Sequence, residues 1–392
     1  MLHKMPIILI ILIISILIFN PLLPVSAKQI MYALSLTIKS GIIFILPFII
    51  FSLLFKAAVG LAHRASLVIA YLLILICCSN FCSTFLSHYV GSWIYHFDLS
   101  LILPKEAQGL MPAWSCSFPK WIPNNVAMFL GLSTGIILGA FKANFAQKLA
   151  GYLEWLVSKL LKSFTFFIPL FVTGFVMKLQ YDGVIQTIIK DYASIFFMIA
   201  AAQFTYIFLA YFIINHFTLH RAWSSIKNML PAAIAGFSTM SSAAVMPLTI
   251  LGAESNAKNK DVARSVIPAS VNVHLVGDCF AIPIFAFAVM KSFGLAEPTF
   301  LSYLIFVCYF VLAKFSVAAI PGGGIIVMLP ILETYLGFNA EMLSLITALY
   351  ILFDPVITCT NVLGNGAFAQ LVDRLQFANK RSTYQRPDLE VA

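Results

Sequence analysis

The sequence predicts an all-α membrane protein with several spanning helices, and three observations support this fold class. Of its 392 residues, 61% are hydrophobic and only 10% are charged, and the mean hydropathy is +0.96. The apolar residues form continuous stretches near spanning length, which a soluble core does not use. These stretches do not alternate between apolar and polar positions, and this argues against a transmembrane β-barrel. We therefore expect a polytopic helical protein in a lipid bilayer.

The first part of the chain predicts six spans. The start of the chain is similar to a signal peptide, because His3 and Lys4 precede an apolar run. That run is near spanning length and the rest of the chain is itself membrane-like, so we expect an uncleaved first helix. An aromatic and proline-rich stretch at 96–125 is expected to be exposed. Hydropathy places the six spans at 5–27, 30–57, 66–93, 126–141, 156–177 and 193–215.

The later part of the chain is broken by small and polar residues. One break, at 318–324, combines Pro321 with three successive glycines, and a second, at 236–247, has the same character. Unpaired backbone at membrane depth is tolerated only inside protein or against a water-filled cavity. Paired interruptions of this kind indicate the binding site of a secondary transporter. The order predicted is a hairpin at 226–252, a span at 263–290, a hairpin at 299–335 and a span at 340–376.

The complete prediction is therefore eight transmembrane helices plus two re-entrant hairpins, arranged as inverted repeats. The net charge of +9 follows from topology: with the N-terminus inside, sixteen of the 24 Lys and Arg fall on the cytoplasmic side and eight fall outside. This satisfies the positive-inside rule and leaves no argument for nucleic-acid binding. We expect a multi-pass protein of the cytoplasmic (inner) membrane with both termini in the cytoplasm. The seven scattered cysteines are expected in the core, and no cofactor or metal is implied.

Ionisable residues at membrane depth are the first candidates for function. Asp354 has the clearest setting, because Thr358, Asn361 and Asn365 follow at steps of four, three and four and so share its helical face. The alternative is that this polar stripe only hydrogen-bonds neighbouring helices. The carboxylate and the nearby broken hairpins favour a binding site.

Other polar residues have weaker settings. His274 and Asp278 share a helical face by spacing, and an internal ion pair or a packing contact explains them equally well. Lys314 and Glu333 are expected to be structural, with their charged ends reaching the outer surface.

Serines gather at the predicted tip of the first hairpin. Ser238, Ser241 and Ser242 lie where hydroxyls and helix N-terminal N–H groups could hold a carboxylate. Simple packing of small residues is the alternative.

These motifs together resemble the glutamate/aspartate-type family of dicarboxylate/amino acid:cation symporters. The resemblance rests on the serine-rich stretch at 241–247 and on Ile-Pro-Gly-Gly-Gly at 320–324. It also rests on 354–365, which is similar to the family's final-helix motif Asp-x-x-Arg-Thr-x-x-Asn-Val-x-Gly-Asp. Order and spacing agree over roughly 225–378. Membership implies a homotrimer in which a rigid scaffold holds a mobile transport domain that carries the solute across the bilayer, an elevator-type mechanism.

The resemblance also implies domain boundaries. These are 1–60 for scaffold helices 1 and 2; 61–95 for helix 3 of the transport domain; 96–180 for a periplasmic or extracellular loop with scaffold helices 4 and 5; 181–378 for the rest of the transport domain; and 379–392 for a cytoplasmic tail.

The same resemblance implies roles for single residues. Ser242 would bind the solute's carboxylate, helped by the backbone at 319–320, and Asp354 would bind its amino group. Thr358 and Asn361 would complete the pocket. The full set expected to bind solute is Ser241, Ser242, Asp278, Ala319, Ile320, Gly324, Asp354, Ile357, Thr358 and Asn361.

Departures from the family pattern predict the solute and the coupling ion. Ile357 stands where acidic-solute members have Arg, and a buried carboxylate without a partner is strongly disfavoured, so we expect a solute with a neutral or apolar side chain. The family's sodium motif Asn-Met-Asp-Gly-Thr is replaced at 274–278, and its final-helix carboxylate is Asn365 here. Sodium coupling of the usual kind is therefore not expected.

We expect His274 or Asp278 to carry a proton instead, with Asn361 and Asn365 as further coupling residues. A rival interpretation is that Asp278 binds a cationic group of a basic or amine solute. The expected partners are a small solute, a co-transported cation, the lipid bilayer and further copies of the chain.

Two other function classes stay open beside a symporter. A protein that keeps the transporter fold but senses a solute or leaks an ion would fit the altered cation motif, and accumulation against a gradient separates it from a transporter. An intramembrane protease could pair Asp278 with Asp354, or Ser238 with His274. Neither pair has the full local signature, since Leu275 stands where Gly is needed and Gly is absent after Ser238. We therefore expect a transporter and not an enzyme.

Overall fold

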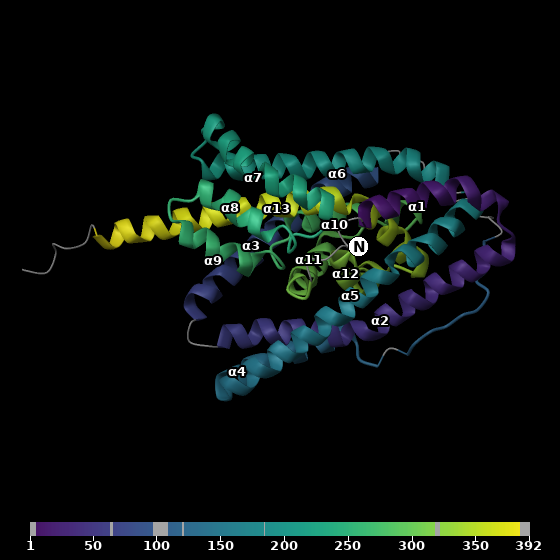
Figure 1. The fold of residues 1–392 in the computed structure, drawn as a ribbon, viewed down its shortest axis with the longest axis horizontal. Helices are drawn as coiled ribbons and strands as arrows, with labels where there is room; N and C mark the ends of the chain where they lie inside the picture. The colour runs from purple at the N-terminus through teal and green to yellow at the C-terminus, as the bar shows by residue number, and fades with distance from the viewer. Residues whose placement is uncertain are drawn as a thin grey trace, which may run out of the picture.

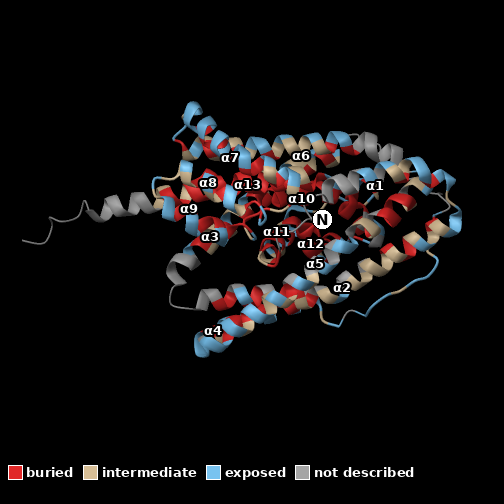
Figure 2. Cartoon of the chain, viewed as in Figure 1, coloured by how far each residue is buried: buried red, intermediate tan, exposed pale blue. Residues whose placement is uncertain are grey.

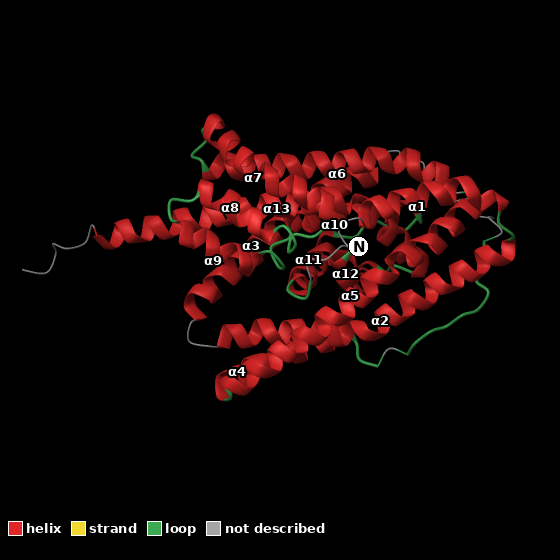
Figure 3. Cartoon of the chain, viewed as in Figure 1, coloured by secondary structure: helices red, strands yellow, loops and turns green. Residues whose placement is uncertain are grey.

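A computed structural model describes residues 5–62, 66–96, 109–119, 121–183, 185–317 and 322–384. Among these residues every regular element is a helix and there is no strand, so the all-α prediction is confirmed (Figure 3). The elements in chain order are α1 (Met5–Phe19), η2 (Asn20–Leu22), α2 (Val25–Ala62), α3 (Ser66–His96), α4 (Asn124–Phe141), α5 (Ala143–Tyr181), α6 (Ile185–Ile214), α7 (Leu219–Thr239), α8 (Met246–Asn256), α9 (Lys260–Ser270), α10 (Val276–Ser292), α11 (Phe300–Lys314), α12 (Gly323–Leu336) and α13 (Ala340–Tyr384).

Three helices of the described chain are long and apolar enough to cross a bilayer by themselves. They lie at Tyr71–His96 in α3, Tyr192–Ile214 in α6 and Glu341–Leu375 in α13. Shorter apolar stretches lie in α2, α4, α5, α11 and α12. This pattern is that of a multi-pass membrane protein, and the count of eight spans stays a prediction.

The helices form two groups (Figure 1). In one group α1, α2, α4 and α5 pack mainly on each other, and the other group contains α3 and α6 to α13. Small residues allow close packing within the first group, because a Cβ added at Gly131 or Gly135 of α4 would lie 2.6 Å from atoms of α2. Close approach through small residues is the common way for helices to associate in a bilayer.

The break near the N-terminus lies at a different position from the one predicted. Helix α1 is followed by the short turn η2, and α2 begins at Val25, directly after Pro24. The predicted break between the spans 5–27 and 30–57 is wrong, because Lys28, which lies between them, is inside α2 with its ammonium 5.6 Å from the centre of the Tyr181 ring. Pro24 fits this position because the residues just before a helix need no backbone donor.

The segment predicted as the first hairpin contains the helices α7 and α8, which pack against each other. Asn228 donates to the side-chain oxygen of Asn256 at 2.8 Å, and Asn256 donates to the backbone oxygen of Ser225 at 2.9 Å. A Cβ at Gly252 would lie 2.7 Å from the backbone oxygen of Asn228, so the two arms touch closely there. The turn between the arms begins at Met240, which has a left-handed backbone with φ of 51°.

The segment predicted as the second hairpin contains the helices α11 and α12. Its arms pack through Tyr309 and Tyr335, whose rings stack with centres 4.3 Å apart. Helix α12 begins after Gly322, whose φ of 71° favours glycine. The residues at 318–321, including Ala319 and Ile320 of the predicted binding set, lie outside the described residues.

The span predicted at 263–290 is not continuous, which corrects the prediction. Helix α9 ends at Ser270 and α10 begins at Val276, so residues 271–275 are unwound. Asn80 of α3 donates to the backbone oxygen of Val273 at 2.7 Å and accepts from the N–H of Leu275 at 3.3 Å. These bonds satisfy backbone groups that have no helical partner, which is a requirement inside a membrane protein.

Helix α13 forms the centre of the second group. In its membrane-length window 76% of the residues are buried, against 22% for α6 and 28% for α3. Figure 2 shows the same contrast, with buried residues concentrated around α10, α12 and α13 and exposed ones along α6. A polar site on α13 is therefore enclosed by protein, whereas α3 and α6 each present an apolar face outward.

Candidate functional site

Both hairpins meet α10 and α13 at one small buried cavity of about 20 Å³. This volume holds roughly one water molecule. Six members of the predicted binding set are in its wall: Ser242, Asp278, Gly324, Asp354, Thr358 and Asn361. The other lining residues are Met240, Leu275, Val317 and Tyr350.

Asp354 connects the middle of α13 to the second hairpin. One carboxylate oxygen accepts the N–H of Gly322 at 2.8 Å, and the other accepts the hydroxyl of Thr358 at 3.2 Å. The side chain is only 3% exposed. Pro355 follows inside the helix and has no backbone N–H. The carbonyl four residues earlier therefore lacks its usual helical donor beside the site. A carboxylate offers about four acceptor positions, so Asp354 can still accept bonds from a solute.

Asp278 lies in the first turn of α10 and has two partners. Its Oδ1 accepts the hydroxyl of Tyr350 at 2.5 Å, and its Oδ2 lies 3.6 Å from the ammonium of Lys314. Lys314 is fully buried, so the prediction that its charged end reaches the surface is wrong. The error has a physical cause: hydropathy shows that α11 is apolar but not that its C-terminal end packs inside the protein against α10.

Gly324 stands where this network leaves no room for a side chain. A Cβ at this position would overlap the hydroxyl of Tyr350 and would lie 2.6 Å from Oδ1 of Asp278. The first turn of α12 therefore packs with its backbone directly on the Tyr350 and Asp278 pair. Gly324 therefore has a packing role in the structure, and its predicted part in solute binding stays a prediction.

The C-terminal part of the polar stripe on α13 forms hydrogen bonds with the unwound segment 271–275 and with the start of α10. Asn361 accepts the N–H of Gly277 at 2.8 Å, and Asn365 donates to the backbone oxygens of Asn361 at 2.8 Å and of His274 at 3.3 Å. The stripe thus divides: Asp354, Thr358 and Asn361 line the cavity, whereas Asn365 packs against residues 271–275. The alternative of hydrogen bonding to neighbouring segments therefore describes Asn365, and binding at the three cavity-lining residues stays a prediction.

His274 lies behind the cavity and not in its wall. Its Nε2 is 2.8 Å from the hydroxyl of Ser79 on α3, and its ring stacks on Phe368 with centres 4.6 Å apart. It precedes α10, so the prediction that His274 and Asp278 share a helical face is wrong. The spacing rule assumed a helix that is unwound at this point.

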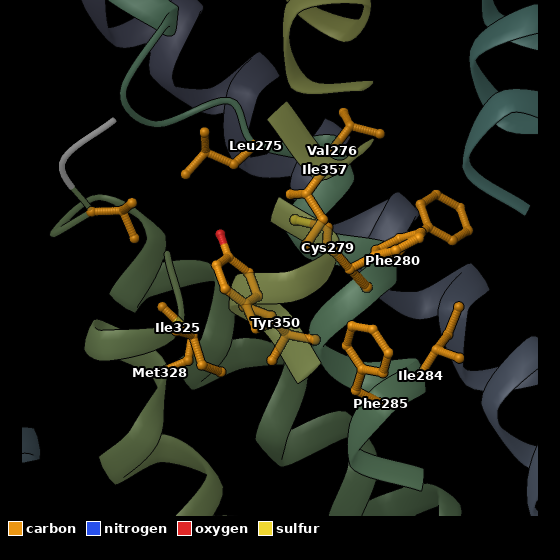
Figure 4. Close-up of a cluster of buried hydrophobic side chains, with 14 of the residues drawn as sticks. Leu275, Val276, Cys279, Phe280, Ile284, Phe285, Ile325, Met328, Tyr350 and Ile357 are labelled. Atoms are coloured by element: carbon orange, nitrogen blue, oxygen red, sulfur yellow. The ribbon is translucent and has the colours of Figure 1, made fainter. Parts of the chain in front are cut away.

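Three remaining candidates lie outside the cavity wall. Ser241 is half-buried and its hydroxyl accepts the N–H of Ala244 at 3.3 Å, whereas Ser238 is exposed on α7 and donates to the backbone oxygen of Ile234. Ile357 is fully buried and belongs to the apolar cluster around Val276 and Cys279 (Figure 4). The described wall of the cavity contains no Lys or Arg that could take the place of the arginine found at this position in acidic-solute members.

Sequence reasoning missed several residues that build the site. Tyr350 stands four residues before Asp354 on the same helical face, so the spacing that found the stripe was also able to find it. Asn80 belongs to a similar polar stripe in α3 and is fully buried. Gln203 of α6 donates to the backbone oxygen of Gly277 at 2.8 Å. The partners of Asn80 and Gln203 lie far away in sequence, and helical spacing cannot connect them.

Comparisons with known proteins agree with the motifs. A model of the Sodium:dicarboxylate symporter family matches residues 5–375. Excitatory amino acid transporter 1 of Homo sapiens is 29% identical over 170 residues, which are 43% of this chain and 30% of that protein. Excitatory amino acid transporter 1 of Ambystoma tigrinum is 30% identical over 161 residues, covering 40% of this chain and 29% of the relative. The excitatory amino acid transporter of Onchocerca volvulus is 28% identical over 154 residues, covering 38% and 30%. Each match thus spans less than a third of the relative.

Proposed function

Because the chain belongs to the sodium:dicarboxylate symporter family, a family of transporters and not of enzymes, we propose that it carries a small amino-acid-like or carboxylate solute across a membrane by secondary active transport. The observation that carries this proposal is the cavity where both hairpins meet α10 and α13. In secondary transporters, solute and ion sites lie where broken helices from two repeats meet. The family removes the intramembrane protease from consideration.

The charges around the cavity support a solute with an amino group and a neutral side chain. Asp354 offers free acceptor positions to an ammonium, and Ser242 offers a hydroxyl to a carboxylate. Asp278 already faces Lys314, so it is less available to the solute. An acidic side chain would find no free cation at the described wall, since Ile357 lies in the apolar cluster. A buried carboxylate without a partner is strongly disfavoured.

The proposed movement is that of an elevator within a homotrimer. Solute entry requires the cavity to open, and among the described residues the bond from Gly322 to Asp354 joins the start of α12 to α13. The group formed by α1, α2, α4 and α5 would be the scaffold, and α3 with α6 to α13 would move with the solute. The protein would lie in the inner membrane with both termini in the cytoplasm.

For coupling we propose a proton, with His274 as the carrier. His274 Nδ1 and Asn365 Oδ1 are both buried without a hydrogen-bond partner among the described residues, and the two side chains are neighbours. Protonation gives the ring an N–H on both nitrogens, which supplies donors to Ser79 and Asn365 together. Asp278 is the weaker candidate, because Lys314 already provides its positive charge.

Uptake into proteoliposomes tests the function. A panel of labelled neutral, basic and acidic amino acids and dicarboxylates is offered with an inward proton gradient or an inward sodium gradient, each imposed separately. We expect accumulation of a neutral amino acid above its external concentration with the proton gradient. Sodium-driven uptake of an acidic solute would contradict both the solute and the ion proposed. Equilibration without accumulation would instead indicate a leak or a sensor.

His274→Gln is expected to lower proton-driven accumulation by about tenfold, because it removes the titrating ring while keeping a polar side chain; coupling free energies between two ligands are usually 1–3 kcal/mol. The pH dependence of uptake should disappear in the same variant. His220→Gln changes an exposed histidine of α7 and is the matched control. If His274→Gln and Asp278→Asn both keep the wild-type pH dependence, the proton proposal fails.

A further inference from the structure

Lys314 is the most unusual charged residue of the described chain, because it is fully buried in an apolar helix. Its ammonium makes no hydrogen bond with any described residue. It lies 3.6 Å from Oδ2 of Asp278 and 4.6 Å from the centre of the Phe310 ring. Removing an ammonium from water is costly, and the cost is offset only by an opposite charge and favourable geometry. Asp278 is therefore the reason that Lys314 can stay inside, although their separation is longer than a hydrogen bond.

The position of the pair connects it to the cavity. Lys314 ends α11, the first arm of the second hairpin, and Asp278 lies in the cavity wall. The titratable side chains around Asp278 are Lys314 from α11, Tyr350 and Asp354 from α13, and its own neighbour Cys279. With both carboxylates and the lysine ionised, the site carries one net negative charge. Without the lysine it would carry two within one buried space.

We propose that Lys314 is a built-in counter-cation, whose ammonium neutralises Asp278 so that the closed site needs only one further positive charge. The inference rests on the proposed function for the identity of that further charge, which is the amino group of the solute at Asp354. A tethered ammonium has a high effective concentration and cannot diffuse away, so it fills a cation position permanently. Without this ammonium, the two buried carboxylates would repel each other, and ionisation of both at once would be disfavoured.

The proposal predicts that removal of Lys314 creates a requirement for a cation from solution. In Lys314→Met, a side chain of similar length keeps the packing while Asp278 loses its partner. We expect the unfolding midpoint of the purified protein to fall by roughly 5 °C in choline chloride at neutral pH. Sodium or a lower pH should restore most of the loss, because either one neutralises the extra carboxylate. The wild-type midpoint should respond to either one much less than that of Lys314→Met, because its site carries one net negative charge and not two.

Two further variants separate charge from packing. Lys314→Met combined with Asp278→Asn removes both charges, and its midpoint should lose the dependence on sodium and pH that the single variant gains. Lys56→Met breaks the exposed ion pair between Lys56 of α2 and Glu154 of α5 and is the control, expected to gain no such dependence because Glu154 stays in contact with solvent. A Lys314→Met protein that is equally destabilised in every buffer overturns the proposal, and so does a double variant that stays cation-dependent.

The measurement does not involve transport, so the two ideas fail separately. If the protein moves no solute but Lys314→Met gains cation dependence, the counter-cation stands and the proposed function falls. If uptake is observed but Lys314→Met shows no cation dependence in its stability, only the counter-cation is overturned.

Discussion

Gly324→Ala is expected to abolish solute uptake, with an initial rate at least roughly 100-fold below that of the wild type. A methyl group at this position would overlap the hydroxyl of Tyr350 and would lie 2.6 Å from Oδ1 and 3.1 Å from Cγ of Asp278. Neither neighbour has space to retreat, because both are buried and joined by a 2.5 Å hydrogen bond. Overpacking costs about 1–3 kcal/mol, and a buried polar group that loses its partner costs about the same again.

The effect should concentrate at the site. Moving Tyr350 from Asp278 leaves the carboxylate with Lys314 as its only partner among those described, and moving α12 away from α13 weakens the bond from Gly322 to Asp354. Both changes disturb the wall of the cavity that we propose for the solute. Uptake should therefore fall much further than the amount of folded protein.

A control and a rescue make this prediction sharp. Gly151→Ala on α5 places the same methyl group in open space and should leave uptake unchanged. Gly324→Ala combined with Tyr350→Phe removes the hydroxyl that the methyl group meets, and should recover part of the uptake relative to Gly324→Ala alone. Rates are normalised to folded protein by size-exclusion chromatography. Gly324→Ala retaining more than half of the wild-type rate would show that the site is not packed this tightly in the transporting protein.

The sequence predicted those parts of the site that local rules control. Helical spacing placed Asp354, Thr358 and Asn361 on one face, and α13 carries them to the cavity because that helix is continuous there. The glycine run and the serine-rich stretch predicted two breaks, because Gly and Pro disfavour helix wherever they occur. Local backbone preference and periodicity were sufficient for these elements.

Local rules failed where distant residues decide the structure. Residues 271–275 contain no Gly or Pro, and the hydrogen bonds that satisfy their unwound backbone come from Asn80 and Asn365 on two other helices. Lys314 looked like a surface residue because its carboxylate partner lies on α10 and not on α11. Both errors concern polar residues whose partners are far away in sequence. The spacing of residues within one helix cannot predict contacts of this kind, because the partner lies on another helix.

Asp354→Asn is expected to weaken solute binding by on the order of 100-fold, since truncating one partner of a buried charged hydrogen bond costs about 2–5 kcal/mol. The substitution keeps the size of the side chain and one acceptor oxygen, so the bond from Gly322 or that from Thr358 can persist. What disappears is the negative charge that we propose for the solute's amino group. The measurement is the equilibrium dissociation constant of the solute identified in the uptake panel.

Asp373→Asn is the matched control on the same helix. Asp373 is equally buried and accepts the N–H groups of Lys258 at 2.8 Å and Asn259 at 3.0 Å, which join α8 to α9. It has no part in the cavity wall. Its substitution should lower the unfolding midpoint, because a buried N–H loses a strong acceptor, and should leave the dissociation constant unchanged.

Stability should respond to Asp354→Asn in the opposite direction. Asp354 and Asp278 are like charges in one buried space and Lys314 pairs with Asp278, so removing the charge at 354 relieves repulsion in the empty site. We expect the unfolding midpoint of solute-free Asp354→Asn to stay level or to rise while its affinity falls. A carboxylate that destabilises the solute-free protein but is required for binding serves the ligand and not the fold. Such a trade-off between stability and activity is expected at a functional site. A midpoint that falls together with affinity would assign Asp354 to packing instead.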